Sequence, residues 1–164
     1  MTTATLRDWW TVPLRLIVGY GFMAHGCAKV VRGPEVFVGI LGGIGIPAPE
    51  VMGWATIVLE IVCGLAVLLG AYVAWVSLPM AAILLVATFT VHLPNGFSSI
   101  KLQAVTAAGA RFGQPGYETD LLYLACLAAL VLGGAGPLAW DGARARRRAL
   151  SSHESTLPSP GPRA

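Results

Sequence analysis

The chain has 164 residues, of which 55% are hydrophobic and 12% charged, and its formal net charge is +3. This length accommodates one helical bundle, and so large an apolar fraction excludes an ordinary soluble domain. The positive charge does not indicate nucleic-acid binding. Four of the eleven basic residues, Arg144 and 146–148, form a run beside a hydrophobic segment, which is typical of a membrane-flanking anchor.

Four apolar segments are predicted to form helices that cross the membrane. They run over Val12–Val31, Val51–Gly70, Tyr72–Leu93 and Tyr117–Gly134. The second and third are almost contiguous, so they are expected to form an antiparallel hairpin. The sequence therefore predicts an all-α fold, an integral membrane antiparallel four-helix bundle over residues 1–141.

The distribution of lysine and arginine predicts the orientation of this bundle. Basic residues gather near the two ends of the chain, while the connections 32–50 and 94–116 hold only three of them. Because cytoplasmic segments carry the excess of positive charge, both termini are predicted to be cytoplasmic. Pro34–Leu41, in the first long connection, is expected to form a short interfacial helix. Residues 142–164 are expected to be a basic, Ser/Pro-rich disordered cytoplasmic tail that touches anionic lipid.

Glu60 is the only ionisable residue of the second segment and lies near its centre. A carboxylate at this depth is unfavourable by at least ~2.5 kcal/mol unless it is paired, protonated or hydrated. His25 and Lys29 lie four residues apart on one face of the first helix. At helical rise, His25 lies about 12 Å and Glu60 about 13 Å below the outer boundary. We therefore expect His25 and Lys29 to pair with Glu60.

Further polar residues are expected at the outer ends of the third and fourth helices. Together with the three residues above, they give a set of candidates for binding a ligand or handling protons: His25, Lys29, Glu60, His92, Tyr117 and Glu118. Asp120, in the same region, is interpreted as a solvated interfacial group. A purely structural His–Glu pair remains the alternative for His25 and Glu60. At the inner end, Arg15 and Asp141 are predicted to form a structural clasp.

The sequence gives no sign of a metal site or an intrinsic cofactor. Its three cysteines, Cys27, Cys63 and Cys126, fall one per apolar segment and form no CxxC pair. A haem held by two histidines is not expected, because His25 and His92 differ in depth by about 10 Å. Glycines such as Gly19, Gly26 and Gly64 are interpreted as positions of close helix packing.

Five short motifs follow one another along the chain: HGxxK at His25–Lys29, a GIP turn at Gly45–Pro47, ExxxG at Glu60–Gly64, HLPNGF at His92–Phe97 and GPxxxD at Gly136–Asp141. Their order resembles the DoxX family of small bacterial membrane proteins. The similarity extends over roughly Arg15–Asp141, and Ala139 stands where the family usually has a serine. The resemblance implies a multi-pass, four-helix protein of the bacterial inner membrane. Some members are subunits of thiosulfate:quinone oxidoreductase or of a terminal quinol oxidase, and others are membrane partners of soluble enzymes of superoxide and thiol defence.

Three functions remain open from the sequence. In the first, the chain is a membrane subunit of an oxidoreductase system that binds a quinone-like or other small lipophilic ligand in the outer polar cluster. No redox centre is visible, so electrons would come from a partner subunit, and whether the chain is itself catalytic stays open. In the second, it is a non-catalytic anchor or assembly partner for a soluble redox or stress enzyme. The third is a small proton-coupled transporter, although known exporters of that kind are shorter and place their glutamate on the first helix. A homo-oligomer is compatible with all three.

Overall fold

A computed structural model describes residues 9–144, so most of the predicted cytoplasmic tail lies outside the described residues. The chain is mainly helical. Its elements, in chain order, are α1 (Thr11–Arg32), α2 (Pro34–Gly43), α3 (Pro49–Leu69), α4 (Val73–Ala87), the π-helix η2 (Thr88–His92), the 3-10 helix η3 (Leu93–Asn95), the strands β1 (Leu102–Thr106) and β2 (Gly109–Phe112), and α5 (Glu118–Gly133).

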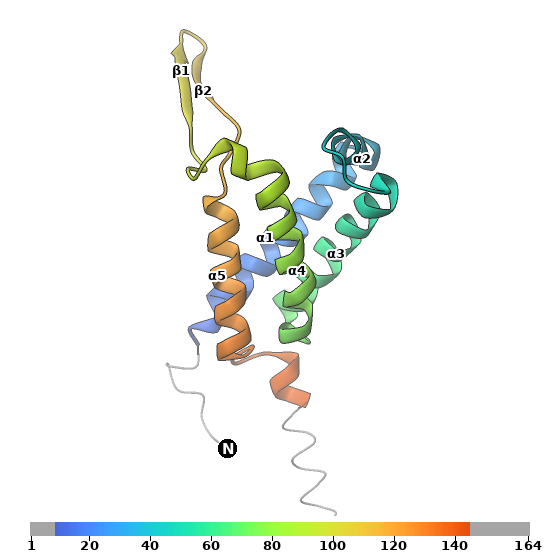
Figure 1. The fold of residues 1–164 in the computed structure, drawn as a ribbon. Coiled ribbons are helices and arrows are strands. Elements are labelled where there is room, and N and C mark those ends of the chain that lie inside the picture. Colours follow the sequence, from blue (N-terminus) through green and yellow to red (C-terminus); the bar gives the residue numbers. More distant parts are fainter. Residues whose placement is uncertain (1–8, 145–164) are drawn as a thin grey trace, which may run out of the picture.

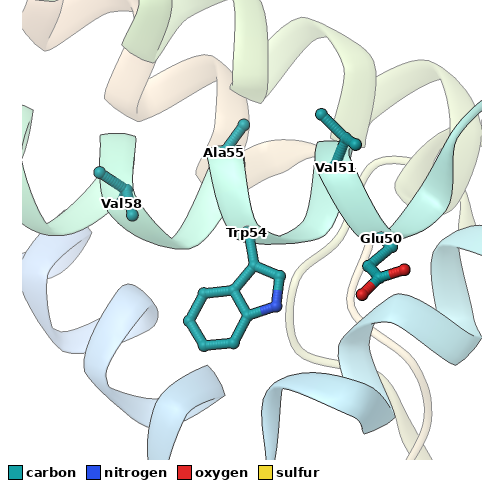
Figure 2. Close-up of a pocket in the computed structure, with 5 residues that line it drawn as sticks. All are labelled: Glu50, Val51, Trp54, Ala55 and Val58. Carbon is teal, nitrogen blue, oxygen red and sulfur yellow. The ribbon is translucent and has the colours of Figure 1, made fainter.

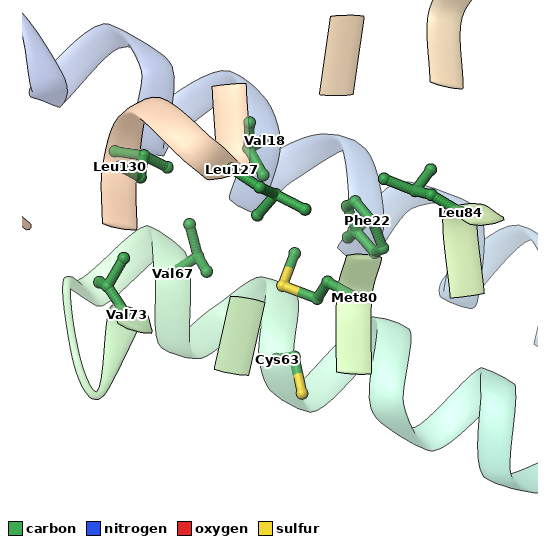
Figure 3. Packing of buried hydrophobic residues seen from close by; sticks show 9 residues of the cluster. All are labelled: Val18, Phe22, Cys63, Val67, Val73, Met80, Leu84, Leu127 and Leu130. Atoms are coloured by element: carbon green, nitrogen blue, oxygen red, sulfur yellow. The ribbon is translucent and has the colours of Figure 1, made fainter. Parts of the chain in front are cut away.

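The four long helices pack against one another around a shared apolar core (Figure 1). Each of them contributes to this core, which is drawn in Figure 3 and consists of Val18, Phe22, Cys63, Val67, Val73, Met80, Leu84, Leu127 and Leu130. We call the end of the molecule that carries α2 and the strands the outer end, and the opposite end the inner end. The core fills the inner and middle parts of the helices. Toward the end that carries α2 and the strands, α1 and α3 lean away from α4 and α5 (Figure 1). Two helix pairs therefore separate at that end, and each has its own polar residues there.

Helix α2 forms where the sequence predicted a short helix, while its position at a membrane interface stays a prediction. The sequence predicted this helix over Pro34–Leu41, and it extends over Pro34–Gly43. Proline is favourable in the first turn because its missing N–H has no partner there in any helix. The helix lies across the outer ends of α1 and α3 (Figure 1).

The chain is mainly helical, as predicted, but a β-hairpin that the sequence did not predict interrupts the helices. Strands β1 and β2 pair antiparallel within the connection between the third and fourth long helices. The hairpin projects from the same end of the molecule as α2 (Figure 1), and every residue of both strands is exposed. The register pairs Leu102 with Phe112 and Val105 with Ala110, so one face of the ribbon is apolar.

The third long helix changes its hydrogen-bonding pattern before it ends. Regular α-helix stops at Ala87, and the next five residues form a π-helical turn. The Thr90 hydroxyl lies 2.7 Å from the carbonyl oxygen of Val86, where it competes with backbone N–H donors. The single hydroxyl proton of Thr88 is shared between two acceptors, the carbonyl oxygen of Leu84 at 2.8 Å and Asp120 Oδ2 at 2.9 Å. This wider turn sets the direction of His92, the last residue of η2.

Candidate functional site

Helices α1 and α3 approach closely because two glycines face each other where the helices cross. A methyl group added to Gly19 would lie 2.7 Å from the carbonyl oxygen of Gly64, and one added to Gly64 would lie 2.9 Å from that of Gly19. One added to Gly26 would lie 3.1 Å from Cβ of Glu60. The interpretation of these three glycines as packing positions is therefore confirmed. Their small size brings the outer half of α1 against the face of α3 that carries Glu60.

Lys29 and Glu60 form a two-point ion pair in this outer half. The Lys29 Nζ atom lies 2.6 Å from Oε1 and 2.5 Å from Oε2 of Glu60. The side chain of Glu60 is 7% exposed and that of Lys29 is 21% exposed. The pair compensates a carboxylate that would otherwise be strongly unfavourable in an apolar surrounding. Two of the three ammonium N–H groups are occupied by the carboxylate, and no other hydrogen bond within residues 9–144 uses the third.

Helix α2 covers this ion pair with an aromatic ring. The Nζ atom of Lys29 lies 4.7 Å from the centroid of the Phe37 ring. A cation at this distance from a ring face is attracted by its quadrupole, and the attraction strengthens where water is excluded. The ammonium group is therefore held between a carboxylate on α3 and an aromatic ring on α2, with partial access from outside.

His25 differs from the expectation that it would pair with Glu60. Its side chain is exposed, and it forms no hydrogen bond or ion pair with another of the described residues. The reason lies in the packing of α1. Gly26 faces α3, and the preceding residue is rotated by about 100° from it around the helix. Lys29 reaches Glu60 from the next turn because its longer side chain can bend back.

A second buried carboxylate lies between η2 and α5. Asp120 Oδ2 is 2.5 Å from Nδ1 of His92 and 2.9 Å from Oγ1 of Thr88. The Asp120 side chain is 8% exposed and the His92 ring 25% exposed. Thr88 and His92 are four residues apart on η2, so one carboxylate receives both of them. The arrangement is a His–Asp pair at the outer end of the α4–α5 helix pair.

The interpretation of Asp120 as a solvated group was therefore wrong. It lies in the first turn of α5, where acidic residues are common for their interaction with the helix dipole, and this made it look ordinary. The signal that could have found it is the Thr88–His92 spacing at the end of the preceding apolar segment. That spacing presents two hydrogen-bonding side chains on one face, where an acceptor is needed.

Tyr117 and Glu118 belong to the base of the β-hairpin and contact neither the Lys29–Glu60 pair nor the His92–Asp120 pair. The Tyr117 ring packs edge-on against Phe97, with 5.6 Å between the ring centroids. The Glu118 Oε2 atom accepts a hydrogen bond of 2.9 Å from the backbone N–H of Ser99. Backbone bonds from Gly116, Tyr117 and Glu118 to residues 96–98 continue the ladder below the strands. Both side chains therefore help to fix the hairpin to the helices.

Arg15 binds the segment that follows α5, and Asp141 belongs to that segment, but the two side chains do not form an ion pair with each other. Arg15 is buried and donates hydrogen bonds of 2.8 and 3.4 Å to the carbonyl oxygens of Ala135 and Pro137. Asp141 accepts bonds of 2.9 and 3.3 Å from the backbone N–H groups of Tyr72 and Val73, where α4 begins. The two side chains thus connect three helices at the inner end through separate contacts.

An open hollow on the outer half of α3 lies apart from the polar residues. It is lined by Glu50, Val51, Trp54, Ala55 and Val58 (Figure 2). At about 100° per residue, the middle of this set lies on the side of α3 away from Glu60. The Trp54 ring stands out from the helix in Figure 2. Over residues 9–144, no group of three His, Cys, Asp or Glu side chains is placed to hold a metal ion.

The helices and their exposed apolar side chains define an integral membrane protein. Pro49–Leu69 and Val73–Asn95 are long and apolar enough to cross a bilayer. Their outward faces carry exposed side chains such as Val62 and Leu78, which require lipid around them.

The sequence model of the DoxX family matches residues 11–93, and the chain belongs to this family. The match includes α1 to η2, and therefore both members of the Lys29–Glu60 pair and His92, while Asp120 lies beyond it. No curated protein and no solved structure matches the chain.

Proposed function

We propose that the chain is a multi-pass protein of the bacterial inner membrane in which α1, α3, α4 and α5 all span the bilayer and both termini are cytoplasmic. The described ends of the chain lie together, opposite to α2 and the hairpin (Figure 1), which supports an even number of crossings. Exposed tryptophans at this end support its position at a membrane interface: Trp9, Trp10, Trp75 and Trp140. Arg144 lies there as well and supports the cytoplasmic assignment.

Within this arrangement, we propose that the protein binds a quinone-like ligand at the Lys29–Glu60 pair and serves as a membrane subunit of an oxidoreductase system. The observation that carries the proposal is the partly exposed ammonium group held between Glu60 and Phe37. A quinone carbonyl oxygen needs a hydrogen-bond donor, which the third N–H of Lys29 supplies, and its ring suits the apolar and aromatic surroundings. The electrons would be supplied by a partner protein.

Thermal unfolding of the purified protein with added decylubiquinone tests this function. We expect the quinone to raise the melting temperature of the wild type and of Lys101→Met, in which a lysine away from the pair is changed. A double variant, Lys29→Met/Glu60→Leu, removes both charges together and so avoids an unpaired buried charge. It should fold and lose the shift. An equal shift in the double variant, or none in the wild type, would contradict the proposal.

The second candidate is a non-catalytic anchor for a soluble redox or stress enzyme. It is favoured by the hairpin, which projects beyond the helices with an exposed apolar face. In this case the Lys29–Glu60 pair only joins α1 to α3. A charge-swapped variant, Lys29→Glu/Glu60→Lys, would then restore the stability lost in either single substitution, and the quinone would leave the melting temperature of the wild type unchanged.

A further inference from the structure

The His92–Asp120 pair determines which nitrogen of the histidine ring carries a proton. The Asp120 carboxylate lies in the first turn of α5, where the N-terminal end of the helix favours a negative charge. An ionised carboxylate only accepts hydrogen bonds, so Nδ1 of His92 must donate to Oδ2 across the 2.5 Å that separate them. In a neutral ring, the other nitrogen, Nε2, then carries a lone pair and is an acceptor.

This acceptor lies where a lipophilic molecule can reach it. The His92 ring is partly exposed, and no hydrogen bond within the described residues uses its Nε2 atom. Phe89 and Leu93, which flank His92 on the same turns, are both exposed. The site is built on a π-helical turn, a departure from regular helix that is frequent at functional sites.

The Lys29–Glu60 pair and the His92–Asp120 pair therefore present opposite hydrogen-bonding groups to a ligand. At the first, both oxygens of Glu60 are occupied by Lys29, and an N–H donor remains. At the second, Nδ1 of His92 is occupied by Asp120, and a nitrogen acceptor remains. A carbonyl oxygen fits the first group and a hydroxyl group fits the second.

We propose that His92 forms a second ligand site, which accepts a hydrogen bond from the hydroxyl group of a reduced, hydroquinone-type molecule at the outer end of α4 and α5. Asp120 acts there as a positioning residue that fixes the ring and its tautomer, with Thr88 holding the carboxylate. The proposal rests on the proposed function for the class of ligand, because the two sites then take the two forms of one molecule.

Nitrogen NMR of the full chain labelled with 15N-histidine tests this proposal in detergent micelles at a pH where the ring is neutral. The probes are a decyl-substituted hydroquinone, kept reduced under nitrogen, and its dimethyl ether, which lacks the hydroxyl hydrogens. We expect His92 to have a protonated Nδ1 and an unprotonated Nε2. The hydroquinone should shift the Nε2 resonance, and the dimethyl ether should not. The signal is assigned by its loss in His92→Gln, and the exposed His25 serves as an internal control.

Variants separate positioning from binding. Asp120→Asn should mix the two tautomers and weaken hydroquinone binding by about fivefold, as expected for the loss of one well-oriented hydrogen bond. Thr88→Val should keep the tautomer. A wild-type His92 ring protonated at Nε2, or an equal response to the dimethyl ether, would overturn the proposal. Both measurements use the wild-type protein, so they do not depend on whether a variant folds.

The oxidised quinone distinguishes this site from the first one. A wild type that shows no melting shift with decylubiquinone overturns the proposed function at Lys29–Glu60. A hydroquinone response at His92 in the same sample still supports a hydroxyl site. The double variant Lys29→Met/Glu60→Leu should retain the His92 response, and its loss there would contradict two separate sites.

Discussion

Glu60 and Asp120 are both carboxylates buried between two helices, but different features of the chain bring their partners to them. At Glu60, regular helices approach closely through glycine, and a long, flexible lysine closes the remaining distance. At Asp120, the partners are short side chains, and a π-helical turn presents them to the carboxylate. The comparison indicates that the first site depends on helix packing and full charge compensation, whereas the second depends on local backbone geometry and hydrogen bonding.

Removing one charge of the Lys29–Glu60 pair should have the largest effect on the free energy of unfolding. Lys29→Met leaves the Glu60 carboxylate buried without a partner, and we expect it to lower the free energy of unfolding by about 3–5 kcal/mol. Reversible unfolding in mixed detergent micelles, followed by circular dichroism, measures this. Lys101→Met should be close to neutral. If Lys29→Met were equally neutral, the pair would not stabilise the contact between α1 and α3.

The second-largest loss in the free energy of unfolding is expected when the glycine contact between α1 and α3 is disturbed. Gly64→Ala places a methyl group 2.9 Å from a backbone carbonyl oxygen, and we expect a loss of about 1–3 kcal/mol as the helices move apart. Gly39 in α2 has no neighbouring atom within 4 Å of the added methyl, so Gly39→Ala should be neutral or slightly stabilising. The same unfolding measurement compares the two, and the two alanines behaving alike would show that close approach is not what places Glu60.

Loss of the Thr88 hydroxyl at the second site should lower the free energy of unfolding by a smaller amount. Thr88→Val removes a hydroxyl group that contacts a buried carboxylate, and we expect a loss of about 1 kcal/mol. Thr90 lies on the same π-helical turn but is exposed, so Thr90→Val is a matched control. A loss no larger for Thr88 than for Thr90 would mean that Asp120 does not need this hydrogen bond.

His25→Gln should have the smallest effect. The ring is exposed and pairs with neither carboxylate, so its replacement is expected to change the free energy of unfolding by less than about 0.5 kcal/mol. It should also leave the quinone-induced melting shift unchanged. A loss comparable to that of Lys29→Met would restore the pairing that the sequence predicted.

The helices and the Lys29–Glu60 contact could be predicted from sequence because they follow from strong physical constraints. A long apolar segment must be helical in lipid, and its one carboxylate needs a partner at the same depth. The choice between His25 and Lys29 could not be made, because it depends on the rotation of α1. That rotation is set by which glycine faces α3, and Gly19 and Gly26 each have several small neighbours along the helix.

The hairpin could not be predicted, and the Asp120 site was missed, for different reasons. The strands have short, weakly alternating sequences in a connection rich in glycine and proline, which also fits an irregular loop. The burial of Asp120 follows from the π-helical turn before it. The Thr88–His92 spacing places two hydrogen-bonding side chains near one another, but a single extra residue in a turn leaves no periodic signal in an apolar segment. The spacing alone therefore did not identify Asp120 as their shared acceptor.

The contact of Asp141 with the first turn of α4 has a consequence for the synthesis of the chain. The N–H groups of Tyr72 and Val73 both donate to the carboxylate of Asp141, which follows them in the chain by 69 and 68 positions. While the nascent chain enters the membrane, α4 therefore begins without its final hydrogen-bond acceptor and gains it only once α5 has been made. The contact between the start of α4 and the segment after α5 therefore forms late in synthesis.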